Sequence, residues 1–181
     1  MYFSKFTAFA ILAASAIAAP ISDVTAPVKR ANLLTAQPYS EFQVSSGTAG
    51  NALAEVDEKF HAAEFRANPT AVSDSDIEIL KAARVTAENA ETESGGYNDA
   101  IDAAGKDTAA GKALQNGKIK NKVLKLELQV LLADIQIGQG DNSSDVVSHR
   151  ATELKKLNSN VATDTKNAGQ ASTAVDFQGS S

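Results

Sequence analysis

The chain of 181 residues contains no cysteine and no tryptophan, and it has only two histidines. Without cysteine it cannot be a thiol enzyme, a disulfide oxidoreductase or a cysteine-ligated metal protein. Small exported domains often rely on disulfides to compensate for a small core, so packing alone must hold this fold.

Positive charge is also scarce, because 17 Lys and Arg stand against 22 Asp and Glu, which gives a net charge of −5. Nucleic acids and anionic membranes are bound by clustered Lys and Arg, so we expect no nucleic-acid partner. Beyond residue 30 the aromatic residues are few, and a platform that stacks on sugars or bases is hard to assemble from them. They are Tyr39, Phe42, Phe60, Phe65, Tyr97 and Phe177.

The N-terminus carries an apolar run that is typical of a signal peptide. Lys5 supplies the positive start, and residues 6–17 form a hydrophobic segment too short to span a bilayer. The small residues that follow predict cleavage between Ala18 and Ala19, with residues 1–18 as the signal peptide. A buried N-terminal helix is the alternative. No later run is apolar enough to cross a membrane, so we expect a secreted, extracellular protein without a transmembrane segment.

A second processing site follows the leader. Residues 19–30 contain two prolines and no helical periodicity, so they should be extended and accessible to a protease. The pair Lys29 and Arg30 predicts cleavage after Arg30 by a kexin-type protease, although an ordinary solvated basic pair is the alternative. Residues 19–30 would be a propeptide and residues 31–181 a single helical domain with a net charge of about −7.

Apolar residues recur at spacings of three and four in four segments, which is the period of amphipathic helices. The segments begin near Thr48, at Ser75, at Lys118 and after Asp145, and they end at Asn68-Pro69, at Gly95-Gly96, at Gly138 and near Ala168. Ser75 with Glu78 predicts a capping box at the start of the second helix. Residues 95–117 are rich in Ala and Gly, so we expect a flexible connection there, with a short helix in the DAIDAA stretch left open.

The third helix is the most strongly patterned, because two apolar stripes give it a wide apolar face. Its narrow polar face carries Lys118, Lys122, Lys125 and Gln129. Such a helix must be covered on more than one side, so it is either the centre of a bundle or partly the seam of a homodimer. Since most connections are short, we predict an all-α fold, an antiparallel four-helix bundle. An extended arm over residues 31–46, pinned to the core through its aromatics, should precede it.

Two loops superficially suggest ligand chemistry. GKDTAAGKAL is similar to a phosphate loop, but five residues separate Gly105 from Gly111 where four are needed, and no strand precedes it. DNSSD starts like a calcium loop, yet Val146 stands where the turn needs glycine and Thr152 where a bidentate glutamate belongs. An Ala/Gly connector and helix capping are the simpler interpretations.

A metal site is similarly unsupported. Glu58 and His61 have the spacing of a di-iron motif, but those proteins need two such motifs and two further glutamates, and His149 has Val146 three residues before it. We therefore assign no catalytic, cofactor-binding or metal-binding residue and expect no enzyme activity and no cofactor. A modification is predicted instead, because Asn142-Ser143-Ser144 is an N-glycosylation sequon in an expected surface loop.

The leader, the VKR pair and the stretches AQPYSEFQVSSGTAGNALAEVDEKF, LQNGKIKNKVLKL and NVATDTKNAGQAS resemble fungal small secreted proteins with no assigned activity. The resemblance implies secretion and a helical fold, and it implies loosely a candidate effector or a wall-associated protein. Through its leader and alanine-rich helices the chain is also similar to the hydrophobic-surface-binding protein A family of filamentous fungi.

These features lead to one expected function and two alternatives. We expect a non-enzymatic secreted helical protein that acts by contact with an unidentified host, cell-wall or surface component. The wide apolar face of the third helix suggests the first alternative, a carrier or surface-active protein that binds an apolar ligand or a hydrophobic surface. An uncharacterised hydrolase is the other.

Overall fold

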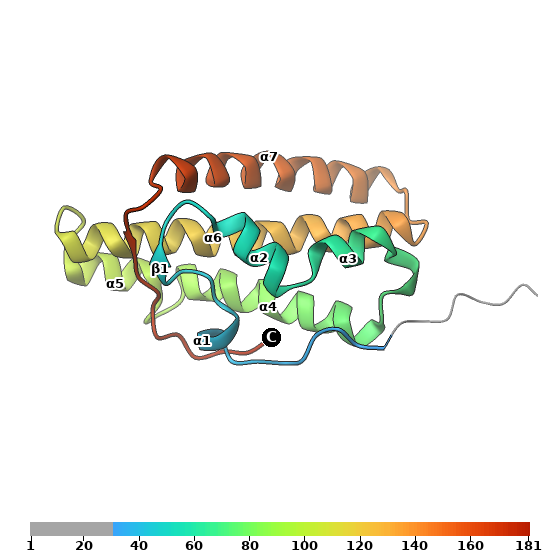
Figure 1. Cartoon of the computed structure of the whole chain (residues 1–181), viewed down its shortest axis with the longest axis horizontal. Helices are drawn as coiled ribbons and strands as arrows, with labels where there is room; N and C mark the ends of the chain where they lie inside the picture. Colours follow the sequence, from blue (N-terminus) through green and yellow to red (C-terminus); the bar gives the residue numbers. More distant parts are fainter. Residues whose placement is uncertain (1–30) are drawn as a thin grey trace, which may run out of the picture.

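The structure is a computed structural model that describes residues 31–181 (Figure 1). The predicted signal peptide with its cleavage site at Ala18 and Ala19, and the propeptide ending at Lys29-Arg30, lie outside the described residues. The described chain is mostly helical, which confirms the predicted class, and it adds one small antiparallel sheet. The helices are α1 Tyr39–Phe42, α2 Ala52–Lys59, α3 Ala62–Ala67, α4 Asp74–Thr92, α5 Tyr97–Ala104, α6 Ala109–Gly138 and α7 Ser144–Lys166; the 3₁₀ turn η1 is Pro69–Ala71, and the strands are β1 Gly47–Thr48 and β2 Ala171–Ser172.

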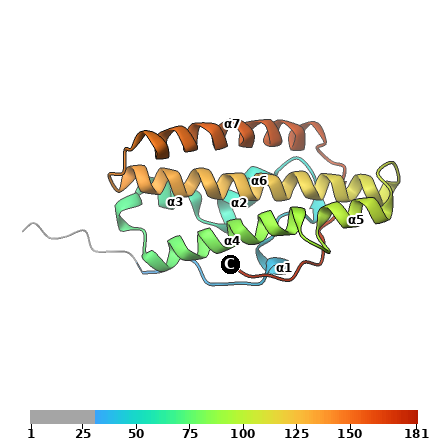
Figure 2. The same ribbon diagram turned by 180° about the vertical axis from the view of Figure 1, so that it is seen from behind.

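Helix α6 is the central element of the fold. Helices α4 and α5 lie along one side of it, α7 lies along the opposite side, and α2 and α3 cover a third (Figures 1 and 2). Both predicted apolar stripes of α6 are buried over most of their length, and only their ends at Ile119 and Ile137 are partly exposed. Leu124, Leu128 and Leu131 belong to the main core, whereas Val123 and Val130 pack in a second cluster beneath α7. The expectation that this helix needs cover on more than one side is therefore confirmed.

The detailed prediction of a four-helix antiparallel bundle is met only in part. The first expected helix is divided in two, because His61 adopts a left-handed conformation with φ of 52° between α2 and α3. Helix α7 buries little apolar surface, since Leu157 is its one fully covered hydrophobic side chain and Val147 is 46% exposed. Within residues 31–181 no helix combines the length and the hydropathy that crossing a bilayer requires.

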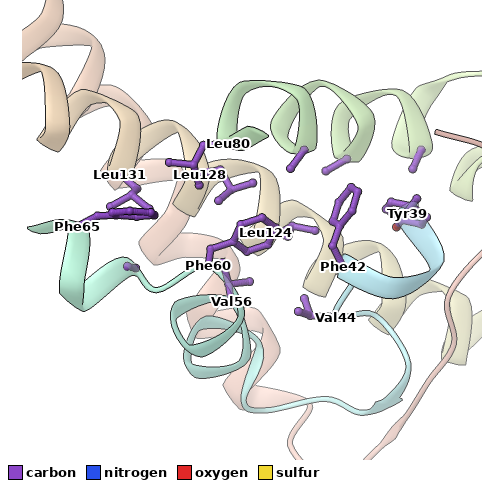
Figure 3. Packing of buried hydrophobic residues seen from close by; sticks show 14 of the residues in the cluster. Tyr39, Phe42, Val44, Val56, Phe60, Phe65, Leu80, Leu124, Leu128 and Leu131 are labelled. Carbon is purple, nitrogen blue, oxygen red and sulfur yellow. The ribbon is translucent and has the colours of Figure 1, made fainter. Parts of the chain in front are cut away.

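The N-terminal arm is held to the core by its aromatic residues. Tyr39 and Phe42 are buried, and Figure 3 shows their rings in the core with Phe60 and Leu124. The Tyr39 N–H donates to the Gly179 carbonyl at 2.8 Å, so the arm also lies against the C-terminal segment. Farther along, β1 pairs with β2, which ties the two ends of the described chain together.

The start of α4 differs from the predicted capping box at Ser75. The N-cap is Ser73, whose Oγ accepts from the Asp76 N–H at 3.0 Å. The buried Asp76 carboxylate also accepts the backbone N–H groups of Leu33 and Leu34, at 3.0 and 2.9 Å. The N-cap of α4 therefore lies two residues before the predicted Ser75, and the same turn of the helix binds the backbone of the arm.

The expected flexible connection over residues 95–117 is wrong, whereas the short helix left open in the DAIDAA stretch is present as α5. Helix α5 occupies part of it, and α6 begins at Ala109, where the Thr108 side chain accepts from the Gly111 N–H at 2.9 Å. The glycines in this stretch permit close packing. At Gly117 a Cβ would lie 2.0 Å from the Thr173 carbonyl oxygen, so glycine lets the C-terminal segment cross directly over α6.

Candidate functional site

The polar face predicted for the third helix is the side of α6 that stays open between α4–α5 and α7 (Figure 2). A groove of about 820 Å³ lies over its N-terminal half, between α5 and the end of α7. Its lining combines four lysines, five amide side chains, a threonine, two isoleucines and a single carboxylate, Asp102. The lysines are Lys106, Lys112, Lys118 and Lys122. We call this cavity the lysine groove.

One nearly buried carboxylate holds three lysines of α6 in place. Glu91 of α4 lies 3.1 Å from the Nζ of Lys122, 3.2 Å from that of Lys125 and 3.7 Å from that of Lys118. Burial raises the pKa of Glu91, but the hydrogen bonds and charges of Lys122 and Lys125 outweigh it, so the net pKa is lowered. A single negative charge offsets only one of the three ammonium groups, and the face keeps an excess of positive charge.

The two remaining lysines of the groove are exposed. Lys106 lies 3.7 Å from Asp102, and both side chains are largely solvated, so this ion pair is weak. Lys112 has no ion-pair partner among residues 31–181. The lysine groove is therefore locally cationic on a chain whose overall charge is negative.

Amide side chains make the wall of the groove rigid. Asn116 is buried, donates to the Ala171 carbonyl at 2.8 Å and accepts from Asn167 at 2.9 Å. These bonds fix the end of α7 and strand β2 against α6. Across the groove, Asn98 of α5 accepts from Lys118 at 2.6 Å. The arrangement can bind anionic groups and hydroxyls in defined positions.

A second groove, of about 640 Å³, lies over the C-terminal half of the same α6 face. Helix α4 forms one wall, and His149 of α7 contributes to the other. Its lining carries two carboxylates, Asp74 and Glu78, and two cations, Lys81 and Arg84, so the formal charges cancel. Lys81 pairs with Glu78, and Arg84 pairs with Glu88 next to the groove. We call it the neutral groove.

An ionic cluster around the buried Glu127 lies on another side of α6. Arg66 of α3 contacts Glu127, Asp134 and Asp57, and Arg150 of α7 also pairs with Asp134. Burial raises the pKa of Glu127 to about 7; Arg66 opposes that increase and Asp57 adds to it. A carboxyl that titrates near neutrality suits general acid–base chemistry, but this one is only 2% exposed and faces Arg66. We therefore assign it a structural role.

Comparison with known families gives one match, over residues 34–176, to a family described as a domain of unknown function (DUF8454). The chain belongs to this family. No curated protein and no solved structure matches the chain. The whole lysine groove lies within the DUF8454 domain, as does the neutral groove.

The residues singled out in the sequence are scattered over the DUF8454 domain. Asn142 is exposed in the loop between α6 and α7, where an enzyme could reach it, and its glycosylation stays a prediction. His61 lies at the surface with its Nδ1 3.3 Å from Glu64. Residues 31–181 hold no cluster of three or more potential metal-binding side chains.

Two lysines of the groove, Lys118 and Lys122, belong to the polar helix face that is predicted from the sequence. Lys106 and Lys112 were not predicted, because they lie in the stretch interpreted as an Ala/Gly connector. Extending the helical period of α6 back to residue 109 would have placed Lys112 near the same face. The residues that α5 and the end of α7 contribute to the groove cannot be predicted in this way, because they lie on other helices.

Proposed function

We propose that this protein is a secreted, non-enzymatic helical protein that acts by contact with a host, cell-wall or surface component, and that the lysine groove binds an anionic group of that component. We further propose that α2–α3, α4–α5, α6 and α7 act as the four antiparallel rods of a bundle that holds the groove rigid. The main support for this proposal is the lining of the lysine groove, which has four lysines and one aspartate although the whole chain has a net charge of −5.

The groove favours binding over catalysis. Lysine ammonium groups attract anions without the planar geometry that arginine imposes, and the amides offer both donors and acceptors to hydroxyl groups. The bonds of Asn116 and the lysines gathered at Glu91 exist before any ligand arrives, which reduces the entropy lost on binding. Because the lysine charges lie at the surface, binding should weaken as salt concentration rises.

Charge reversal at Lys112 tests the proposal. The purified secreted protein is titrated with polygalacturonate at low and high salt, with dextran as the neutral polymer. K112E should weaken polygalacturonate binding roughly tenfold, because reversal replaces an attraction with a repulsion of similar size. The matched control is K155E on α7, which makes the same charge change at an exposed lysine that lines neither groove. Equal effects of K112E and K155E, or equal binding of dextran, would contradict the proposal.

A carrier or surface-active protein is the second candidate function, and the thin cover over one side of α6 favours it. Val123, Leu126 and Val130 are covered in part by α7, whose only fully buried hydrophobic residue is Leu157. Displacement of α7 would expose this apolar face. Depletion of the protein by hydrophobic beads, or a rise in its stability with fatty acids, would support this function; a ligand at 100 times its Kd adds about 2.7 kcal/mol.

A further inference from the structure

We infer that the component bound by the lysine groove is a linear acidic polysaccharide that lies along α6 across both the lysine groove and the neutral groove. This inference rests on the proposed function and narrows it to one class of ligand. Three features support it: the alignment of the two grooves along one face of α6, their different charge, and the kinds of side chain that line them.

The two grooves lie end to end on one stripe of α6. The stripe passes through positions 115, 118, 122, 125, 129, 132 and 136, whose spacings of three and four keep them on one face of the helix. At 1.5 Å per residue this stripe is about 30 Å long. Lys125 lies on it between the grooves, and α4–α5 and α7 form its two sides (Figure 2). Two grooves aligned end to end fit an extended chain better than a compact molecule.

The two grooves differ in charge. The lysine groove has an excess of positive charge, whereas the two carboxylates that line the neutral groove, Asp74 and Glu78, are matched in number by two cations, Lys81 and Arg84. Gln129 and Gln136 supply amides in the neutral groove, and Leu132 supplies an apolar surface. A polymer with carboxylates, hydroxyls and C–H faces in every unit can satisfy both halves. Its carboxylates would meet the lysines, and its hydroxyls would meet the glutamines.

The lining favours a polysaccharide over a nucleic acid. No aromatic side chain of the described residues lines either groove, so bases have no ring on which to stack. No arginine of the described residues lines the lysine groove, and Arg84 in the neutral groove is paired with Glu88. Arginine is the side chain that binds phosphate in a bidentate way. Lysines set among amide side chains suit carboxylates that are spaced among hydroxyl groups.

Binding of oligogalacturonates of increasing length tests the inference. With the purified secreted protein, affinity should rise about tenfold between oligomers that span only the lysine groove and oligomers that span about 30 Å. It should stay constant for longer ones. The double variant Q129A/Q136A should weaken binding of the long oligomers by about fivefold to tenfold and leave the short ones unchanged, because two amide contacts are lost. K112E should weaken both, and the amide control N158A, exposed on α7, should weaken neither.

The outcomes separate this inference from the proposed function. If short oligomers bind as tightly as long ones and remain sensitive to K112E, the extended ligand is wrong and the anion-binding groove stands. If no oligomer and no polygalacturonate binds, both are wrong. Single-stranded DNA that binds more tightly than the long oligomers, with the same sensitivity to Q129A/Q136A, would overturn the choice of polysaccharide.

Discussion

Two ionisable side chains of α6, Lys120 and Glu127, are covered by the rest of the fold. The Lys120 side chain is 0% exposed, and its Nζ donates to Glu55 and to the Thr48 carbonyl at 3.0 Å. These acceptors replace the water that the ammonium group loses, and they tie α2 and the β1 region to α6. Lys118 lies only two positions away, yet it points to nearly the opposite side of the helix and reaches the lysine groove.

Glu127 should make the stability of the protein depend on pH. Its pKa is raised from 4.5 to about 7, so the folded state binds a proton that the unfolded state releases between these values. The stabilising contribution is therefore fully present below pH 4.5 and is lost as pH rises towards 7, by on the order of 1–3 kcal/mol. Urea unfolding of the wild type and E127Q from pH 4 to 8 measures it, and E127Q should flatten this part of the profile. An unchanged slope in E127Q would assign the dependence to other groups.

At the scale of elements, the central position of α6 depends on glycine as much as on its apolar stripes. The stripes bring α4, α2–α3 and α7 onto three sides, and the periodicity of the sequence predicts them. The role of Gly117 cannot be predicted from the sequence, because a glycine within a helical segment normally indicates a weak point of the helix. Here it admits the Thr173 backbone, which positions β2 and the adjoining wall of the lysine groove.

Substitution of Gly117 separates helix propensity from packing. Propensity alone makes G117A about 1 kcal/mol more stable, since alanine is the better helix former. Packing opposes this gain, because the added methyl carbon would lie 2.0 Å from the Thr173 carbonyl oxygen and the backbone would have to move to admit it. We expect a net loss of about 1–3 kcal/mol in thermal or urea unfolding, with weaker polygalacturonate binding. A stabilised G117A protein would mean that the C-terminal segment does not cross α6 here.

At the scale of the whole molecule, both ends of the described chain belong to the fold. Residues 37–48 lie against residues 171–181 through the β1–β2 pairing and the bridge between Pro38 and Ser180. The first backbone contacts of the arm are those of Leu33 and Leu34 with Asp76, whereas Ala31 is exposed. A chain that begins at Ala31 therefore keeps these contacts.

Mass spectrometry of the protein recovered from culture medium tests the proposed secretion and the two proposed cleavages. We expect an N-terminus at Ala31, produced by signal peptidase after Ala18 and a kexin-type protease after Arg30. Digestion with a glycosidase in the same experiment should lower the mass if Asn142 carries a glycan. A mature chain that starts at Ala19 would rule out the second cleavage, and retention of Met1 would rule out both.

The sequence by itself determined the mostly helical class, the two apolar stripes of α6 and its narrow polar face, because helical periodicity is a local property of the chain. It did not reveal the start of α6 at Ala109, since a run rich in Ala and Gly has no strong apolar stripe and resembles a linker. Nor could a net charge of −5 reveal the lysine groove, because net charge sums over all residues regardless of position. Only the tertiary structure shows where the lysine groove lies. It forms where α5 and the end of α7 flank α6, and these contacts join residues that lie far apart in the sequence.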